Sequence, residues 1–250
     1  MPTGAFGGMS LLPECMYNER MTTVLSLGGS IVAPDGVDVG FMRGFASLLD
    51  QLLREGPERR FVLVVGGGGP ARAWQKAYRE LAGDLAGNDE ADWIGVTATR
   101  LNAQLVRAVF ADRCPQEVVT DPNLAPEISG RILVAAGWKP GFSSDYDAVL
   151  LAKRFGAKTV VNLSNIRQVY TADPRKDPAA RPLDRLSWKQ FRELVGEEWV
   201  PGKNVPFDPI ASREADESGL TVICAEGRDL ANLRELLEGR EFVGTTIRAD

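Results

Sequence analysis

The sequence predicts an α/β protein whose mainly parallel central sheet is covered by helices on both faces. From Thr22 onward, short β-branched-rich apolar runs alternate with longer segments of helical periodicity. Several of these runs end directly in glycine turns. The run at residues 61–65 is apolar throughout, which is typical of a strand buried on both faces. Strands with helices packed on either side give three layers, an α/β/α sandwich.

The composition is that of a globular protein and excludes several kinds of chemistry. Hydrophobic residues make up 44% and charged residues 25%, and the net charge of −5 argues against a nucleic-acid surface. There is no histidine, which excludes Ser–His triads and His-ligated metals. The three cysteines are far apart, so we expect a reducing compartment, the cytoplasm. No apolar run is long enough to span a membrane.

We expect one domain at residues 21–250, preceded by a flexible extension at residues 1–20. The extension is rich in Gly, Pro and Met and shows no period. The first strand is expected at Thr22–Leu27, and it runs into the glycine turn 28–30. Apolar residues at helical spacing over 41–53 predict the first long helix.

The central motif is FVLVVGGGGPAR at residues 61–72. It predicts a strand, a turn of four glycines at 66–69 and a helix that begins near Pro70. Glycine lets the backbone approach a ligand closely, and the helix N-terminus presents unpaired N–H groups. Arg72, one turn in, adds a planar fork for phosphate oxygens. We interpret the motif as a phosphate cradle; the alternative is a plain tight turn.

Two other phosphate motifs fit less well. A P-loop, G-x-x-x-x-G-K-[ST], is absent. Residues 66–71 do match G-x-G-x-x-A, which makes a dinucleotide-binding oxidoreductase a formal alternative. That alternative is weak, because the match does not follow the first strand and explains none of the other loops.

A long helix is expected to open at Asp92. Its buried face is expected to carry four apolar residues: Ile94, Leu101, Leu105 and Val109. After a strand at 131–136 comes a third loop, WKPGFSSDYD, in which Ser143 or Ser144 caps the next helix. Asp208 and Pro209 are expected to start a later helix. The remaining elements are expected as strands at 158–163, 220–224 and 242–247, a loop or hairpin at 164–174, and helices at 186–195 and 230–237.

Four loops directly follow strands, and in a parallel sheet such loops lie at one edge. They are residues 28–30, 66–72, 137–145 and 164–173. Several phosphate cradles facing one cleft suggest two phosphorylated ligands or one polyphosphate. Transfer between two such ligands needs alignment and charge neutralisation more than a base, which suits a chain without histidine. Asp145, Asp173 and Asp208 are candidates to hold Mg²⁺ through water or to orient lysines.

Taken together, these motifs resemble the amino acid kinase superfamily, and within it the archaeal-type uridylate (UMP) kinases. The resemblance covers about residues 22–247. Its most specific parts are the segments around TRLNA and VYTADPRKDP. The matching segments, in family order, are LGGS, VVGGGGPAR, DWIGVTATRLNA, PGFSSD, SNIRQVYTADPRKDP, DPIA and GTTI.

The resemblance implies transfer of the γ-phosphate of ATP to UMP, giving UDP and ADP, with Mg²⁺. It also implies the superfamily's α/β sandwich and a homo-oligomer, a hexamer or a dimer. By motif position, ATP would meet Gly29, Ser30, Gly68, Arg72, Ser164, Asn165, Tyr170 and Asp173. UMP would meet Gly67, Asp92, Trp138, Lys139, Pro140, Gly141, Phe142, Ser143 and Ser144. The catalytic residues would be Arg72, Lys139, Asp145 and Asp208.

The chain departs from the family pattern at several positions. Ser26 stands where many superfamily kinases carry lysine, Gly69 where some archaeal-type relatives do, and Phe142 replaces a His or Gln. The usual N-V-D-G reads NIRQ at residues 165–168. Two alternatives therefore stay open. One is a kinase-fold protein that binds a nucleotide or oxyanion without transferring phosphate. The other is a kinase with a different small phosphate or carboxylate acceptor.

Overall fold

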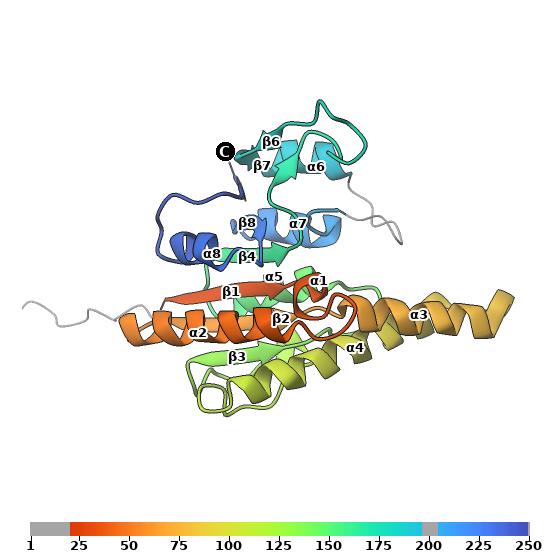
Figure 1. The fold of residues 1–250 in the computed structure, drawn as a ribbon, viewed down its shortest axis with the longest axis horizontal. Helices are drawn as coiled ribbons and strands as arrows, with labels where there is room; N and C mark the ends of the chain where they lie inside the picture. Colours follow the sequence, from red (N-terminus) through yellow and green to blue (C-terminus); the bar gives the residue numbers. More distant parts are fainter. Residues whose placement is uncertain (1–20, 197–204, 250) are drawn as a thin grey trace, which may run out of the picture.

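Seven strands form one sheet in the order β3-β2-β1-β4-β8-β9-β7 (Figure 1). The computed structural model describes residues 21–196 and 205–249, so the extension expected at residues 1–20 lies outside them. Neighbouring strands are parallel except β8 and β9, which confirms the mainly parallel sheet. The strands are β1 (Thr22–Leu27), β2 (Arg60–Val65), β3 (Ile132–Ala135), β4 (Thr159–Ser164), β7 (Arg185–Ser187), β8 (Thr221–Glu226) and β9 (Thr245–Arg248). A separate hairpin pairs β5 (Val169–Tyr170) with β6 (Pro182–Leu183).

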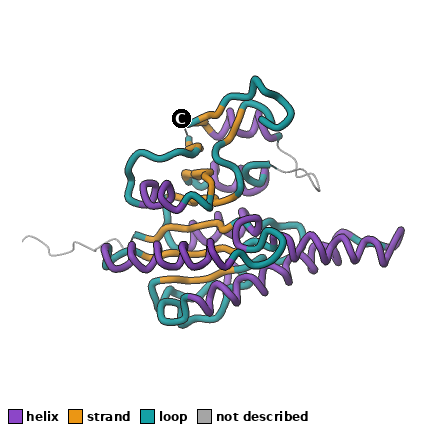
Figure 2. The backbone as a smooth tube through the Cα atoms, viewed as in Figure 1, coloured by secondary structure: helices purple, strands orange, loops and turns teal. Residues whose placement is uncertain are grey.

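Helices and 3-10 turns connect these strands (Figure 2). None of the helices in the described ranges combines the length and apolar composition that a membrane span requires. The helices are α1 (Gly29–Val32), α2 (Val39–Glu55), α3 (Gly68–Ala82), α4 (Asn88–Val109), α5 (Ser144–Arg154), α6 (Trp188–Val195), α7 (Pro209–Glu217) and α8 (Leu230–Leu237). The 3-10 turns are η1 (Gly83–Leu85) and η2 (Pro122–Leu124).

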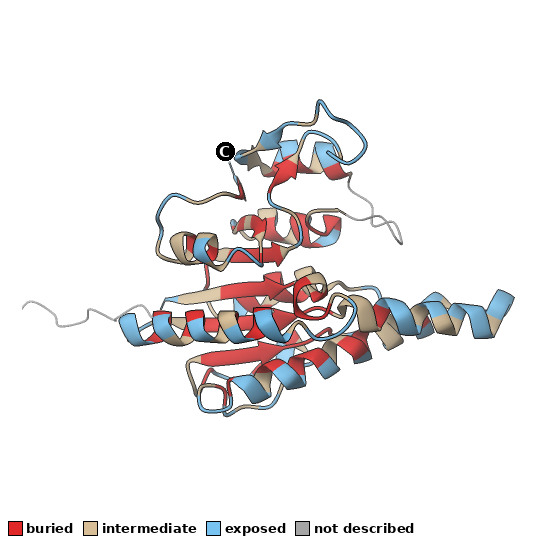
Figure 3. Ribbon diagram, viewed as in Figure 1, coloured by how far each residue is buried: buried red, intermediate tan, exposed pale blue. Residues whose placement is uncertain are grey.

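The core lies in two layers, one on each face of the sheet, with the buried strands between them (Figure 3). Successive side chains of a strand point to opposite faces. In β1, Leu25 and Leu27 pack with α2, α4 and α8, whereas Val24 packs with α5, α6 and α7. The predicted three-layer α/β/α sandwich is therefore confirmed. Ser26 lies on the same face as Val24, toward α5.

Side-chain caps begin several helices, and the caps of α5 and α7 are those that the sequence predicts. Ser143 Oγ accepts the backbone N–H of Tyr146 at 3.3 Å and so caps α5. Asp208 caps α7 by accepting the N–H of Ala211 at 2.8 Å, and Pro209 occupies the first helical position. At α6, Ser187 and Gln190 form a reciprocal capping box. The starts of these three helices are therefore fixed by local sequence.

The buried face expected for α4 is wrong. Leu101 is 68% exposed, and Leu105 and Val109 are also exposed. The helix instead packs through smaller side chains, and this lets it lie close to β2, β3 and α3. The buried residues of α4 are Ala91, Val96, Ala98, Asn102, Ala103 and Val106. The helix also begins at Asn88 rather than at Asp92.

Candidate active site

The four loops at the carboxyl ends of β1, β2, β3 and β4 lie at one edge of the sheet, as expected. These strands are consecutive parallel neighbours, so their carboxyl ends point the same way. Backbone hydrogen bonds join the loops. Gly28 N donates to Leu163 O at 2.8 Å, and Gly66 N donates to Leu27 O at 2.9 Å.

The two glycine turns pack directly against each other. A Cβ on Gly29 would lie 2.0 Å from Gly68 N, closer than any real contact. Gly68 has a φ of +64°, and a Cβ there would lie 2.3 Å from Ala33 O. Gly69 N is already used, since it donates to Ala33 O at 2.8 Å. Part of the glycine run therefore serves packing. Gly67 and Gly68 are the members of the run that line a cleft.

A cleft of about 300 Å³ opens beside these two glycines. It brings together nine of the residues predicted from sequence, drawn from the glycine turn, α3, α4 and the 137–144 loop. They are Gly67, Gly68, Arg72, Asp92, Lys139, Gly141, Phe142, Ser143 and Ser144. Ala71 and Gly137 also line it and belong to loops expected at the cleft, whereas four further lining residues were not predicted: Gln75, Gly95, Val96 and Thr99. These four residues lie on α3 and α4, which pack against each other. Their spacing along the two helices was the available sequence signal.

Other predicted residues lie outside this cleft. Trp138 and Pro140 belong to the 137–144 loop but do not line the cleft. Gly29 and Ser30 form the start of α1, beside the glycine turn. The rest follow the carboxyl end of β4 and reach into the β5–β6 hairpin: Ser164, Asn165, Tyr170 and Asp173. The carboxylate of Asp173 is paired with Arg175 at 3.1 Å, and this pairing lowers its pKa.

Side chains of α4 hold the glycine turn and the 137–144 loop in place. The buried amide of Asn102 donates to Gly66 O at 2.9 Å and to Gly67 O at 3.1 Å. Thr99 Oγ1 accepts the N–H of Gly137 at 2.8 Å. Asp92 Oδ2 accepts the N–H of Gly141 at 3.2 Å. This helix therefore orders both walls of the cleft.

Two aromatic rings lie against the ammonium of Lys139. Its ammonium lies 3.9 Å from the ring centre of Trp138 and 5.2 Å from that of Phe142. Phe142 in turn packs against Tyr146, with ring centres 4.9 Å apart. Cation–π contacts of this kind restrict where an exposed lysine points. Lys139 is thus an exposed cation kept at the cleft.

Behind the cleft, two carboxylates and a serine form a polar group within the apolar face. Ser26 Oγ donates to Asp145 Oδ1 at 3.1 Å, and Asp208 N donates to Asp145 Oδ2 at 3.3 Å. Burial, with the nearby charge of Asp208, raises the pKa of Asp145 to about 7. Burial also raises the pKa of Asp208, against hydrogen bonds from Ala211, Ile210 and Ser143. The bond from Ser143 links this pair to the cleft.

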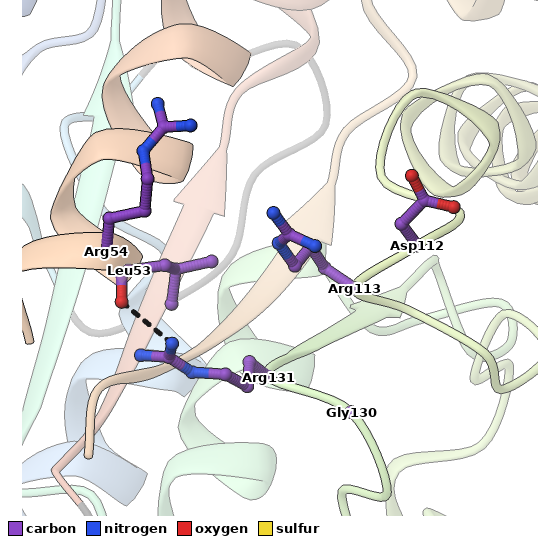
Figure 4. Close-up of a pocket in the computed structure, with 6 residues that line it drawn as sticks. All are labelled: Leu53, Arg54, Asp112, Arg113, Gly130 and Arg131. Carbon is purple, nitrogen blue, oxygen red and sulfur yellow. Dashed lines mark hydrogen bonds between the residues drawn. The ribbon is translucent and has the colours of Figure 1, made fainter. Parts of the chain in front are cut away.

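A second hollow, of about 250 Å³, lies at the opposite edge of the sheet, where β2 and β3 begin (Figure 4). Its central side chain, Arg131, is used by the fold. The guanidinium donates to Leu53 O at 2.7 Å and to Arg59 O at 3.1 Å, and also to Gly56 O. Arg113 is 3.5 Å from Asp50. These contacts tie the end of α2 to the sheet, so we assign this hollow no chemistry.

Comparison with known proteins agrees with this architecture. Residues 21–226 match the model of the Amino acid kinase family. A uridylate kinase of Methanospirillum hungatei is 36% identical over 229 residues, covering 90% of this chain and 94% of the relative. One from Pyrococcus abyssi is 32% identical and is covered to 99%. The crystal structure of the uridylate kinase of Archaeoglobus fulgidus superposes with a TM-score of 0.77 at 34% identity, covering 91% of this chain and all of that one.

The match spans both walls of the cleft and the Asp145 group, since it runs from β1 into β8. A bacterial structure, the UMP kinase of Bacillus anthracis, shares the fold with a TM-score of 0.72 at 21% identity. The chain belongs to the amino acid kinase family, in the branch of the archaeal uridylate kinases.

Proposed function

We propose that this protein is a nucleoside monophosphate kinase that transfers the γ-phosphate of ATP to UMP, giving UDP and ADP. The observation that carries the proposal is the cleft at the sheet edge, where the glycine turn faces Arg72 and Lys139. Membership of the family whose relatives are named uridylate kinases supports the choice of substrates. We assign the protein to the cytoplasm, which suits Cys114 and Cys224, the two cysteines among the described residues, since both are buried and free.

The acceptor would bind against the 137–144 loop. Lys139, Ser143 and Ser144 offer a cation and two hydroxyls for its phosphate, with the N–H of Gly67 beside them. Asp92 would accept hydrogen bonds from the ribose hydroxyls, since hydroxyls donate and a carboxylate accepts. Phe142 supplies an apolar surface. The remaining acceptor residues, Trp138, Pro140 and Gly141, shape the loop.

The donor would lie across the carboxyl ends of β1 and β4. Gly29, Ser30 and Gly68 would meet its phosphates, and Arg72 would lie between donor and acceptor. The nucleoside would extend toward Ser164, Asn165, Tyr170 and Asp173. This side departs most from the family pattern, and its Arg167 is exposed.

Catalysis would rest on positioning and charge. Arg72 and Lys139 would take the charge-stabilising role that relatives give to lysines at the positions of Ser26 and Gly69. Asp145 and Asp208 are the carboxylates that would hold a divalent cation arriving with ATP, because the charge of Asp208 disfavours that of Asp145 in its absence. Two carboxylates plus phosphate oxygens and water are a usual Mg²⁺ environment. Such an ion, when bound, neutralises phosphate charge.

The test is ADP release from Mg-ATP with UMP, with CMP, AMP and no acceptor as controls. Release with UMP alone is the expected result. Release with another acceptor would move the protein to a different substrate within the family. Absence of release with every acceptor, together with calorimetric binding of UMP or ATP, would instead support a kinase-fold binding protein.

We further propose a homo-oligomer, a dimer or a hexamer, formed through α4. Its exposed apolar side chains recur at multiples of four residues along the helix: Trp93, Leu101, Leu105 and Val109. Such a stripe on a long surface helix is typical of a protein–protein contact. We also propose that residues 21–250 form one domain in each subunit.

A further inference from the structure

Asp147 is a buried carboxylate behind the cleft that the proposed reaction does not use. It lies on α5 and is 0% exposed. Oδ2 accepts the backbone N–H of Trp138 at 3.1 Å. Oδ1 has no hydrogen-bond partner within the described ranges. A buried carboxylate with an unpaired oxygen disfavours folding, so stability alone does not explain a carboxylate at this position.

The peptide that Asp147 holds is also held from the other side by α4. Arg100 donates to Trp138 O at 2.9 Å and to Gly137 O at 3.4 Å. Thr99 Oγ1 accepts the N–H of Gly137 at 2.8 Å. The guanidinium of Arg100 therefore binds the carbonyl groups of residues 137 and 138, and the carboxylate of Asp147 binds the Trp138 N–H. Each backbone polar group of residues 137 and 138 has a side-chain partner, and the backbone is fixed immediately before Lys139.

Fixing this peptide also fixes the residue next to it in the chain. The ring of Trp138 carries the ammonium of Lys139 at 3.9 Å, and Lys139 lines the cleft. We propose that Asp147 is a positioning residue for the acceptor phosphate: it fixes the Trp138 amide and thereby the direction in which Lys139 enters the cleft. This inference rests on the proposed function, in which Lys139 meets that phosphate. Small displacements of a positioned charge are costly in a site that works by alignment.

Two substitutions separate this role from a structural one. Asp147→Leu has the same branching and removes the acceptor oxygens, whereas Asp147→Asn keeps one. We expect D147L to raise the KM for UMP about tenfold or more, the scale that the loss of one buried hydrogen bond reaches. The KM for ATP should stay unchanged, and the melting temperature should not fall. D147N should restore a KM for UMP near that of the wild type.

A structural role predicts a different pattern, in which D147L lowers the melting temperature and affects both substrates alike. That result, or an unchanged KM for UMP in D147L, would overturn the proposal. Arg100→Met is the second variant, because it releases the same peptide from the opposite side. It should raise the KM for UMP in the same selective way, and failure to do so would count against the proposal.

Hydrogen exchange of the peptide covering residues 137–144, without substrate, tests the anchoring independently of catalysis. D147L should exchange faster than the wild type, and D147N should not. If D147L shows no faster exchange, the anchoring is refuted. If the wild-type protein releases no ADP with any acceptor, the proposed function fails, and the exchange result still decides whether Asp147 holds the loop.

Discussion

Arg72 contributes little to the stability of the fold. It is exposed, and its guanidinium donates one hydrogen bond, to Pro34 O at 2.9 Å, while it lines the cleft. Arg72→Ala should therefore lower kcat/KM by about 10²- to 10³-fold, the usual effect of removing one transition-state donor, with little change in melting temperature. Arg72→Lys keeps the charge but loses the planar fork, and should fall between the two. A coupled ADP assay measures this, and unchanged turnover in the alanine variant would refute the role.

Asp145 predicts a pH dependence of stability. Its pKa is raised to about 7 by burial and by Asp208, so the folded state binds this proton more tightly than the unfolded state. The free energy of unfolding should then fall as pH rises from about 4 to about 7, and remain lower above. Asp145→Asn removes this cost. In metal-free buffer the variant should be more stable than the wild type at pH 8, by up to about 4 kcal/mol for the full shift, and close to it near pH 4.

Urea unfolding at several pH values measures the difference. A stability difference that did not change with pH would contradict the assignment of the raised pKa to Asp145. Turnover should fall in the same variant, since a neutral amide no longer attracts a cation. Greater stability with lower turnover is the expected signature of a charge kept for function.

At the level of elements, the packing of the glycine turn leads us to expect that two glycines of similar φ differ in the cost of substitution by alanine. Gly68 has a φ of +64°, and a Cβ would lie 2.3 Å from two carbonyl oxygens. Gly83 has a φ of +54°, with open space around the same position. Gly83 has ψ −129°, outside the left-handed helical region, so Gly83→Ala should cost about 1–3 kcal/mol from backbone strain alone. Gly68→Ala should cost clearly more, about 3 kcal/mol or above, and close part of the cleft.

Urea unfolding of the two variants and the wild type measures both losses in the free energy of unfolding. Equal costs would show that the turns do not pack as closely as the structure has them. Because both glycines have a positive φ, the Gly83 variant gives the cost of such a backbone without crowding.

The elements that the sequence predicts best are those that local signals specify. The glycine turns after β1 and β2, the Asp208 cap and the Ser143 cap follow from residue type and position alone. Strand β7 is different, because the sequence predicts most of it as part of the helix at 186–195. Its three residues pair with β9, which comes much later in the chain, and no local pattern encodes such a pairing.

The same distinction holds within the site. Glycines, hydroxyls and cations in the loops are predictable, because their chemistry is visible in the sequence. Asp147 is not, since a carboxylate near the start of a helix is normally solvated and only the fold buries it. One signal was available: Asp147 shares its helical face with the buried Leu151, four residues on. The role of Asn102 also escapes prediction, although the residue belongs to the TRLNA segment.

At the level of the whole molecule, α4 faces two ways. Its small residues pack on the sheet and α3, and its large apolar residues face outward. Hydrophobic periodicity marks an apolar stripe without saying what covers it, which explains why the sequence predicts Leu101 and Leu105 in the core. An apolar stripe that the fold of one chain leaves uncovered favours contact with a second copy.

Leu101→Glu with Leu105→Glu should therefore shift the protein to a smaller species in sedimentation velocity. Two charges brought into an apolar contact stay uncompensated, and the association constant should fall by about 10²-fold or more. The control is Val39→Glu, since Val39 is 59% exposed and lies at the start of α2. That variant should sediment as the wild type does. If the double variant also does so, α4 is not the contact, and the stripe must serve some other partner. Because neither leucine lines the cleft, a fall in turnover that follows the change in assembly would link the contact to the site through α4, whose inner side carries Thr99, Arg100 and Asn102.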